Sequence, residues 1–175
     1  LSDLLQSRDE HPNAMALEIG AGSSPLVQLL SQRYQTVTCV DNSEAMLGAT
    51  RAAITAWGLK NVDCRYADFL TIDPDAQVNL LVINMVLHHI ASPSSFFEAA
   101  RAWVAPEGHL LVIDLCPHDQ DWVRDICGDQ WLGFEPNDLL TWALDAGFHS
   151  DQTAYLGLKN GFQIQIHLFQ PNIEL

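Results

Sequence analysis

Two glycines and two acids near the start of the chain could together bind a nucleotide. Glu18 stands two positions before Gly20, Gly22 follows, and Asp41 comes 21 positions after Gly20. Glycines let a backbone approach a ligand closely because they carry no Cβ, and a helix start offers unpaired N–H groups to an anionic part of that ligand. A carboxylate at the position of Asp41 can accept hydrogen bonds from both ribose hydroxyls. These residues predict a nucleotide site, and the alternative is a plain tight turn with an exposed Asp.

The elements around these residues must bring them together. Residues 15–19 form a short, mostly apolar run that predicts a buried strand. Pro25 suits the first turn of a helix, and residues 36–40 predict a second strand that ends in Asp41. Strand, glycine turn, helix, strand and acid together predict one nucleotide-binding half of a doubly wound sheet.

The rest of the chain continues as an α/β protein. Ser43 is a good N-cap for a helix that ends at Gly58, and Asn160-Gly161 predicts a hairpin turn. The remaining predicted elements are strands 61–67 and 78–84, a helix 93–103 opened by Ser92-Pro93, a turn 106–108, a strand 109–115, a helix from residue 135 that ends before Gly147, and the hairpin strands 153–158 and 161–169. We therefore expect a doubly wound, mostly parallel sheet of about seven strands, closed by an antiparallel C-terminal hairpin strand.

The glycine pattern separates two classes of nucleotide site. A dinucleotide site needs a third glycine three positions after the second, and Pro25 occupies that position, which argues against a dehydrogenase. The run Glu18-Ile19-Gly20-Ala21-Gly22-Ser23-Ser24 instead resembles the first motif of the class I S-adenosylmethionine-dependent methyltransferases, in which an acid precedes three alternate glycines. Only the last glycine differs, and Ser24 replaces it with another small residue.

The resemblance implies a Rossmann-like fold and S-adenosylmethionine as cofactor, with S-adenosylhomocysteine as product. Asp41 would hold the ribose, Asn42 and Met46 would lie beside the adenine, and Asp68 would accept from the adenine amino group, with the backbone N–H of Phe69 on a ring nitrogen. Met46 also fits a plain core position, and Asp68 fits a turn cap. The cofactor-binding residues that the resemblance implies are Glu18, Gly20, Ala21, Gly22, Asp41, Asn42, Met46, Asp68, Phe69 and Asn84.

Histidines supply the candidates for proton transfer. Leu87-His88-His89 matches a Leu-His-His run that the resembled family often has at the exit of its fourth strand. An unperturbed histidine titrates near pH ~6.5 and can take a proton, so His88 and His118 are the candidate bases. The alternative for at least one of the pair at 88 and 89 is a packing or capping role. We expect no metal.

The segment from Cys116 to Phe134 is the most individual part of the chain. Its runs 118–124 and 131–134 are similar to methyltransferase domains fused to winged-helix repressors of the arsenic-sensor type, although no winged helix is present. The wider chain resembles the ubiquinone-biosynthesis-like small-molecule methyltransferases. Trp122, Trp131 and Phe134 could cover a substrate pocket or could belong to the core.

Composition limits the partners. The 175 residues suit a single methyltransferase domain over residues 1–175, with N-terminal lid helices that are short or truncated. The net charge of −14 repels phosphate backbones and argues against nucleic acid, but it does not repel a sulfonium. No membrane-spanning run or signal peptide is seen, and four cysteines without a CxxC spacing suggest free thiols in the cytoplasm. A homodimer is left open.

We therefore expect methyl transfer from S-adenosylmethionine to a small-molecule acceptor by in-line displacement. The alternative is a module that senses the same cofactor without turnover. Residues 84–87 read Asn-Met-Val-Leu and lack the Pro-Pro-aromatic run of an adenine-amino DNA methyltransferase, and no cysteine set of the arsenite-methylating type is present.

Overall fold

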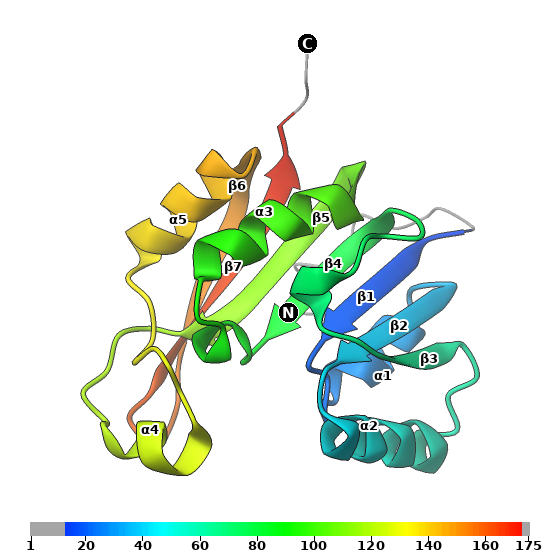
Figure 1. Ribbon diagram of the computed structural model, residues 1–175, viewed down its shortest axis with the longest axis horizontal. Helices are drawn as coiled ribbons and strands as arrows, with labels where there is room; N and C mark the ends of the chain where they lie inside the picture. Colours follow the sequence, from blue (N-terminus) through cyan, green and yellow to red (C-terminus); the bar gives the residue numbers. More distant parts are fainter. Residues whose placement is uncertain (1–12, 173–175) are drawn as a thin grey trace.

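The computed structural model describes residues 13–172, which form one seven-stranded sheet with helices on both faces (Figure 1). The strand order is β3-β2-β1-β4-β5-β7-β6, and every strand is parallel to the others except β7, which runs antiparallel to both β5 and β6. The strands are β1 (Met15–Ile19), β2 (Thr36–Asp41), β3 (Val62–Tyr66), β4 (Val78–Asn84), β5 (Val104–Leu115), β6 (Phe148–Gly157) and β7 (Gln163–Pro171). The expected sheet and its antiparallel C-terminal closure are confirmed.

Within the described residues, five α-helices and two short 3-10 helices connect the strands. They are α1 (Leu26–Ser31), α2 (Glu44–Trp57), η1 (Phe69–Thr71), η2 (Leu87–His89), α3 (Pro93–Trp103), α4 (Trp122–Cys127) and α5 (Pro136–Asp145). Ser43 caps α2 by accepting from the backbone N–H of Met46, and Gly58 ends that helix in the left-handed conformation, as expected from these residue types.

The sheet is buried on both faces because its central strand is apolar on both. In β4, Leu81 and Ile83 pack with Phe96 of α3 and Leu139 of α5, whereas Leu80 and Val82 pack with residues of α1 on the opposite face. A near-continuous apolar run such as this is typical of a parallel strand that helices cover on both sides.

Two strand boundaries differ from expectation. Residues 106–108 were predicted to form a turn, but they lie inside β5, where the register against β4 shifts between Val78 and Leu80. A Cβ on Gly108 would lie 2.9 Å from the carbonyl oxygen of Val78, so a close backbone approach explains this glycine. Strand β6 starts at Phe148, earlier than expected, because its first residues pair with the end of β7.

The sheet order reverses between β1 and β4, which are adjacent although two strands separate them in the chain. In open sheets of this type ligands bind outside the carboxyl ends of the strands at such a switch point. The N-terminal lid expected before β1 falls on residues 1–12, which lie outside the described residues. No helix among residues 13–172 has the length and apolar character to cross a membrane.

Candidate active site

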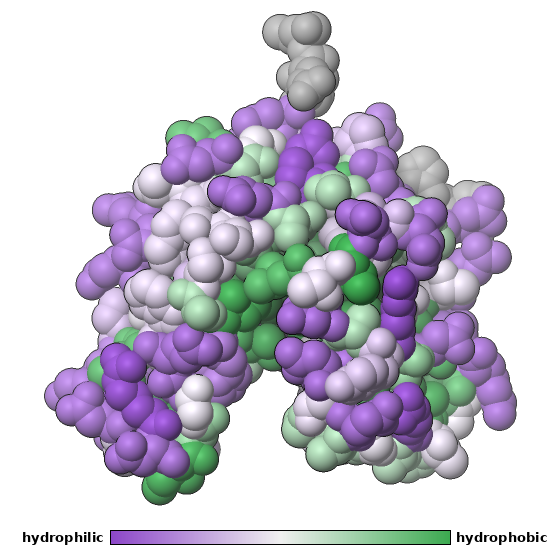
Figure 2. Space-filling model, in the orientation of Figure 1, coloured by the Kyte–Doolittle hydropathy of each residue, from purple (hydrophilic) through white to green (hydrophobic). Residues whose placement is uncertain are grey.

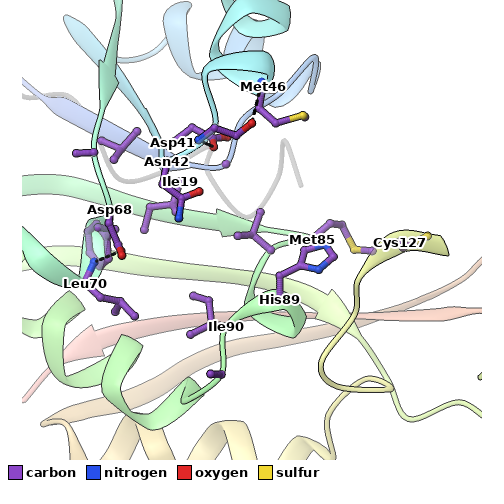
Figure 3. Close-up of a pocket in the computed structure, with 17 residues that line it drawn as sticks. Ile19, Asp41, Asn42, Met46, Asp68, Leu70, Met85, His89, Ile90 and Cys127 are labelled. Carbon is purple, nitrogen blue, oxygen red and sulfur yellow. Dashed lines mark hydrogen bonds between the residues drawn. The ribbon is translucent and has the colours of Figure 1, made fainter. Parts of the chain in front are cut away.

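A cavity of about 580 Å³ opens at the carboxyl ends of β1, β2, β3 and β4. This volume is within the ~300–1,000 Å³ typical of small-molecule sites. Figure 2 shows the molecule hollowed between the part that carries α4 and the part that carries α2, with hydrophobic surface at the inner end. Six of the predicted cofactor-binding residues line the cavity, namely Gly20, Asp41, Asn42, Met46, Asp68 and Phe69 (Figure 3).

The turn after β1 requires its glycines. Gly20 has φ +64° and a Cβ there would lie 2.5 Å from Val86, a residue that also lines the cavity. Gly22 has φ +51° and a Cβ there would lie 2.9 Å from the terminal methyl group of Met46. Both the backbone conformation and the lack of space therefore exclude larger residues, and the turn brings bare backbone to the cavity.

The two acids at this edge are each fixed by a hydrogen bond from the backbone N–H two residues later. One carboxylate oxygen of Asp41 accepts from the backbone N–H of Ser43 at 2.8 Å, and one of Asp68 accepts from that of Leu70 at 3.0 Å. Each bond orients the side chain and leaves the second oxygen able to accept from another group. The two carboxylates come from the ends of β2 and β3 and border the same cavity, as Figure 3 shows.

Glu18 lies behind the turn and is fully buried. Neither of its carboxyl oxygens meets hydrogen-bond geometry with a described partner. Burial raises the pKa of Glu18 to about 8, although the nearby hydroxyl of Ser24 acts in the opposite direction. A buried acid without a strong donor is costly, and a cation or donor supplied from outside would satisfy it.

Three predicted residues lie near the turn but do not line the cavity. Ala21 is buried in the core on the α1 face, and Asn84 donates from its side chain to the hydroxyl of Ser24 at 3.3 Å. Gly22 lies close to Met46 of the cavity wall, since a Cβ on Gly22 would meet its terminal methyl group. Asn84 thus reaches the hydroxyl of Ser24, which lies near the buried carboxyl of Glu18.

The histidine pair after β4 divides into a buried and a lining residue. His88 is buried and its Nδ1 lies 2.7 Å from Asp114, a fully buried carboxylate of β5. Burial alone would lower the pKa of His88, but the hydrogen bond to Asp114 and the charges of Asp114 and Asp129 outweigh it and raise the pKa. His89 lines the cavity instead, so it is the member of the pair that can meet a ligand directly.

Met85, Ile90 and Cys127 also line the cavity and were not predicted. Met85 has φ +57°, an uncommon conformation for a residue other than glycine, and such strain gathers at functional sites. No sequence pattern marks this conformation. Cys127 comes from the end of α4, and Figure 3 shows it beside His89 and Met85.

The residues predicted to be functional in the segment after β5 lie in different surroundings. His118 packs edge-on against Phe162 with ring centroids 4.8 Å apart, and it does not line the cavity. Trp131 and Phe134 pack against Trp142 of α5 and belong to the core, the alternative left open for them. Trp122 is half exposed and lies near Phe162, so the aromatic residues of this segment do not cover the cavity.

Comparison with known proteins adds independent information. Residues 17–112 match the family described as the methyltransferase domain, which is more than half of the chain. Among curated proteins, the chain is 24% identical over 157 residues to the ubiquinone biosynthesis O-methyltransferase of Stutzerimonas stutzeri, with 79% of this chain and 67% of that protein covered. The chain spans about three fifths to two thirds of the length of the curated relatives it matches.

Solved structures show the same fold. A candidate methyltransferase from Bacillus halodurans has a TM-score of 0.82 at 15% identity, with 98% of each chain covered. A SAM-dependent methyltransferase from Aquifex aeolicus has a TM-score of 0.73 at 18% identity, covering 95% of this chain and 88% of that one. At these identities the likeness concerns the fold.

Proposed function

Because this chain belongs to the methyltransferase-domain family, we propose that it transfers a methyl group from S-adenosylmethionine to a small-molecule acceptor. The observation that carries the proposal is the pair of acids at one cavity edge. Asp41 and Asp68 are each held by a backbone hydrogen bond and each keep one free oxygen, and the bare turn at Gly20 lies beside them. This is the arrangement that a ribose, an adenine amino group and a close backbone approach require.

Different residues of the site bind different parts of the cofactor. Asp41 accepts from the ribose hydroxyls, Asn42 and Met46 border the adenine, and Asp68 with the backbone of Phe69 recognises its edge. The methionine end lies toward the turn of Gly20, Ala21 and Gly22, where Asn84 donates to Ser24 and Glu18 lies nearby. The ammonium group of the cofactor would supply the positive partner that the buried carboxyl of Glu18 lacks.

Methyl transfer from this cofactor requires little covalent chemistry from the protein. When bound, S-adenosylmethionine supplies a methyl group already activated on a positive sulfur. The cavity holds the two reactants in line and keeps water out, and such positioning can contribute about 7–11 kcal/mol. Only an acceptor that carries a proton needs a base. Among the histidine candidates, His89 lines the cavity, His88 lies behind it on Asp114, and His118 lies beside Phe162.

The whole-molecule properties favour a small acceptor. With a net charge of −14, the chain repels nucleic acid and tolerates a cofactor that carries a sulfonium. We include in the proposal a single domain over the whole chain and a cytoplasmic location, and a homodimer is compatible with it. The four cysteines are free thiols, as a reducing compartment would keep them.

Calorimetric titration with S-adenosylmethionine, S-adenosylhomocysteine and NADH tests the proposal. We expect the two adenosyl compounds to bind at micromolar levels and NADH to give no signal. Asp41→Asn keeps an acceptor for the N–H of Ser43 but removes the charge, so it should weaken binding about 10- to 100-fold. Asp145→Ala removes an exposed acid far from the cavity and should bind like the unmodified chain. Binding of NADH, or equal affinity in Asp41→Asn, would contradict the proposal.

A further inference from the structure

Three side chains of types that bind metals meet beside the cavity, and of these His89 lines it. His88 and His89 come from η2, directly after β4, and Asp129 comes from the loop after α4. Their ligand atoms all lie within 4.8 Å of one another. Asp129 Oδ1 is 3.8 Å from His88 Nε2 and 3.7 Å from His89 Nδ1. These distances are too long for hydrogen bonds, but they are short enough for electrostatic interaction between the groups.

Backbone contacts hold the two segments together independently of these side chains. The backbone N–H groups of Gln130 and Trp131 both donate to the carbonyl of His88, at 3.0 and 3.1 Å. The side chain of Gln130 donates to the carbonyl of His89 at 2.7 Å, and the indole of Trp131 donates to that of Ile90 at 2.9 Å. Four hydrogen bonds therefore fix the loop against η2 and place the carboxyl group of Asp129 beside the two rings.

Asp129 Oδ1 lies near two imidazole rings but has no hydrogen-bond partner among the described residues. The side chain of Asp129 is only 4% exposed, and Oδ1 is buried with it. Leaving a buried carboxylate unpaired costs several kcal/mol. The atom points at two imidazole rings, so the group that satisfies it must also suit ring nitrogens.

The hydrogen bond of His88 Nδ1 indicates which ring nitrogen of His88 is available to a metal. Asp114 is fully buried and also accepts from the backbone N–H groups of His88 and Leu115. His88 Nδ1 donates to Asp114 at 2.7 Å and Nε2 faces Asp129, so a metal that binds Nε2 displaces any proton held there. A carboxylate behind a histidine, with the far nitrogen free, is the usual support for a metal-ligating imidazole.

We propose that His88 Nε2, His89 Nδ1 and Asp129 Oδ1 bind a divalent cation of the zinc type, for which His89 Nδ1 exchanges its 3.4 Å contact with the carbonyl of Gly128 for the metal. Two imidazole nitrogens and one carboxylate oxygen suit Zn²⁺ or Co²⁺ better than Mg²⁺, which prefers oxygen ligands. Ligand bonds of about 2.0–2.1 Å in a tetrahedral arrangement need ligand atoms about 3.4 Å apart. The distances of 3.7 and 3.8 Å to Asp129 therefore need a small closure, and the two ring nitrogens, which lie within 4.8 Å of each other, must also move closer.

Three protein ligands leave coordination positions open, as catalytic metal sites do. His89 lines the cavity and the exposed thiol of Cys127 lies beside it, so an open position faces the cavity (Figure 3). An oxygen or sulfur donor of the methyl acceptor could occupy that position, and this last point rests on the proposed function. The cation site itself does not depend on it, because its residues and distances stand without any cofactor.

Metal titration of the chelator-treated protein, purified without a histidine tag, tests the site directly. We expect calorimetry with zinc chloride to give about one Zn²⁺ per chain, Co²⁺ to give visible absorption bands of low coordination number, and Mg²⁺ to give no binding. Asp129→Asn keeps the shape of the side chain and should lower the Zn²⁺ affinity at least about 100-fold, and Asp114→Asn should lower it about 10- to 100-fold. Asp129→Asn should also raise the melting temperature of the metal-free protein, because it removes an unpaired buried charge.

Two control variants complete the experiment. His149 is an exposed histidine on β6, and His149→Gln should bind Zn²⁺ like the unmodified chain. Cys127→Ser should also keep the Zn²⁺, which excludes a site built on the thiol. Failure of the folded, unmodified chain to bind Zn²⁺, or equal affinity in Asp129→Asn, would overturn the inference. Titration of the same metal-free samples with S-adenosylmethionine reports separately on the proposed function, because Asp129 is not among its cofactor-binding residues.

Discussion

Glu18 shows how a residue that opposes stability can serve binding. Its carboxyl group is fully buried, and burial raises its pKa to about 8. Between about pH 4.5 and pH 8 the folded chain therefore holds a proton that the unfolded chain has released, so this group makes the protein less stable as the pH rises through that window. A positive ligand group nearby would remove the penalty.

Replacing Glu18 with glutamine separates these two effects. Glu18→Gln cannot ionise, so we expect it to be more stable than the unmodified chain, by a margin of up to a few kcal/mol that grows from pH 5 to pH 8. Its affinity for S-adenosylmethionine should fall about 10-fold because the positive ammonium loses its partner. Urea unfolding at several pH values and calorimetric titration measure both. A margin that does not change with pH, or unchanged affinity, would contradict this account of Glu18.

Gly20 tests the close approach of the backbone to the cavity. Gly20→Ala places a Cβ 2.5 Å from Val86 at φ +64°, whereas Gly58→Ala has φ +67° with nothing within 4 Å. Both variants should lose about 1–2 kcal/mol from the left-handed conformation, measured by urea unfolding. Only Gly20→Ala should also weaken cofactor binding, because Val86 must move in the cavity wall. The double variant Gly20→Ala with Val86→Ala should recover part of that binding. Equal cofactor affinity in Gly20→Ala and Gly58→Ala would contradict a close approach of the turn to the cofactor.

At the level of single residues, spacing predicted well where one local motif holds the side chain. Gly20 and Asp41 could be found because a strand, a turn and a second strand place them. Asp129 could not be predicted as a neighbour of His88. The two residues are 41 positions apart, and Asp129 lies in an irregular loop whose path brings it next to His88. The positive φ of Met85 also has no sequence signal.

At the level of elements, apolar runs located the strands and capping residues located the helices. Strand β4 was predicted with its observed bounds, and Ser92-Pro93 opens α3 as expected. The boundaries of β5 and β6 were missed because a register shift and an edge pairing depend on the neighbouring strand. Local pattern carries no information on either.

Strand β7 carries two fully buried polar residues, Gln165 and His167. Gln165 donates to the carbonyls of Leu115 and Phe134, and its oxygen lies 2.9 Å from His167 Nε2. These bonds join β7 to the end of β5 and to the loop before α5. Phe169, on the same face of β7, packs edge-on against Phe97 of α3, so this face is buried.

His167 makes a pH-dependent contribution through this network. Burial lowers its pKa to about 4, so between pH 6.5 and pH 4 the unfolded chain binds a proton that the folded chain refuses. Stability from His167 is therefore fully present above pH 6.5 and is lost as the pH falls toward 4. We expect urea unfolding to show a larger loss between pH 7 and pH 5 in the unmodified chain than in His167→Gln, which cannot be protonated. Glu18 acts in the opposite direction in both proteins, so an identical pH dependence would contradict the assignment to His167.

At the level of the whole molecule, the sheet order brings distant residues to one edge. Strands β1 to β4 all point their carboxyl ends at the cavity, and the switch between β1 and β4 opens the space between them. A net charge of −14 favours a cationic ligand over a polyanion. Fold, charge and family therefore agree on one class of ligand.

A crystal structure of this chain with S-adenosylhomocysteine tests the central claim most directly. We predict the ribose hydroxyls on the free oxygen of Asp41, the adenine between Met46 and Asp68, and the amino group directed toward Glu18. Density for the ligand outside the cavity at Gly20, or a ribose that does not contact Asp41, would contradict it.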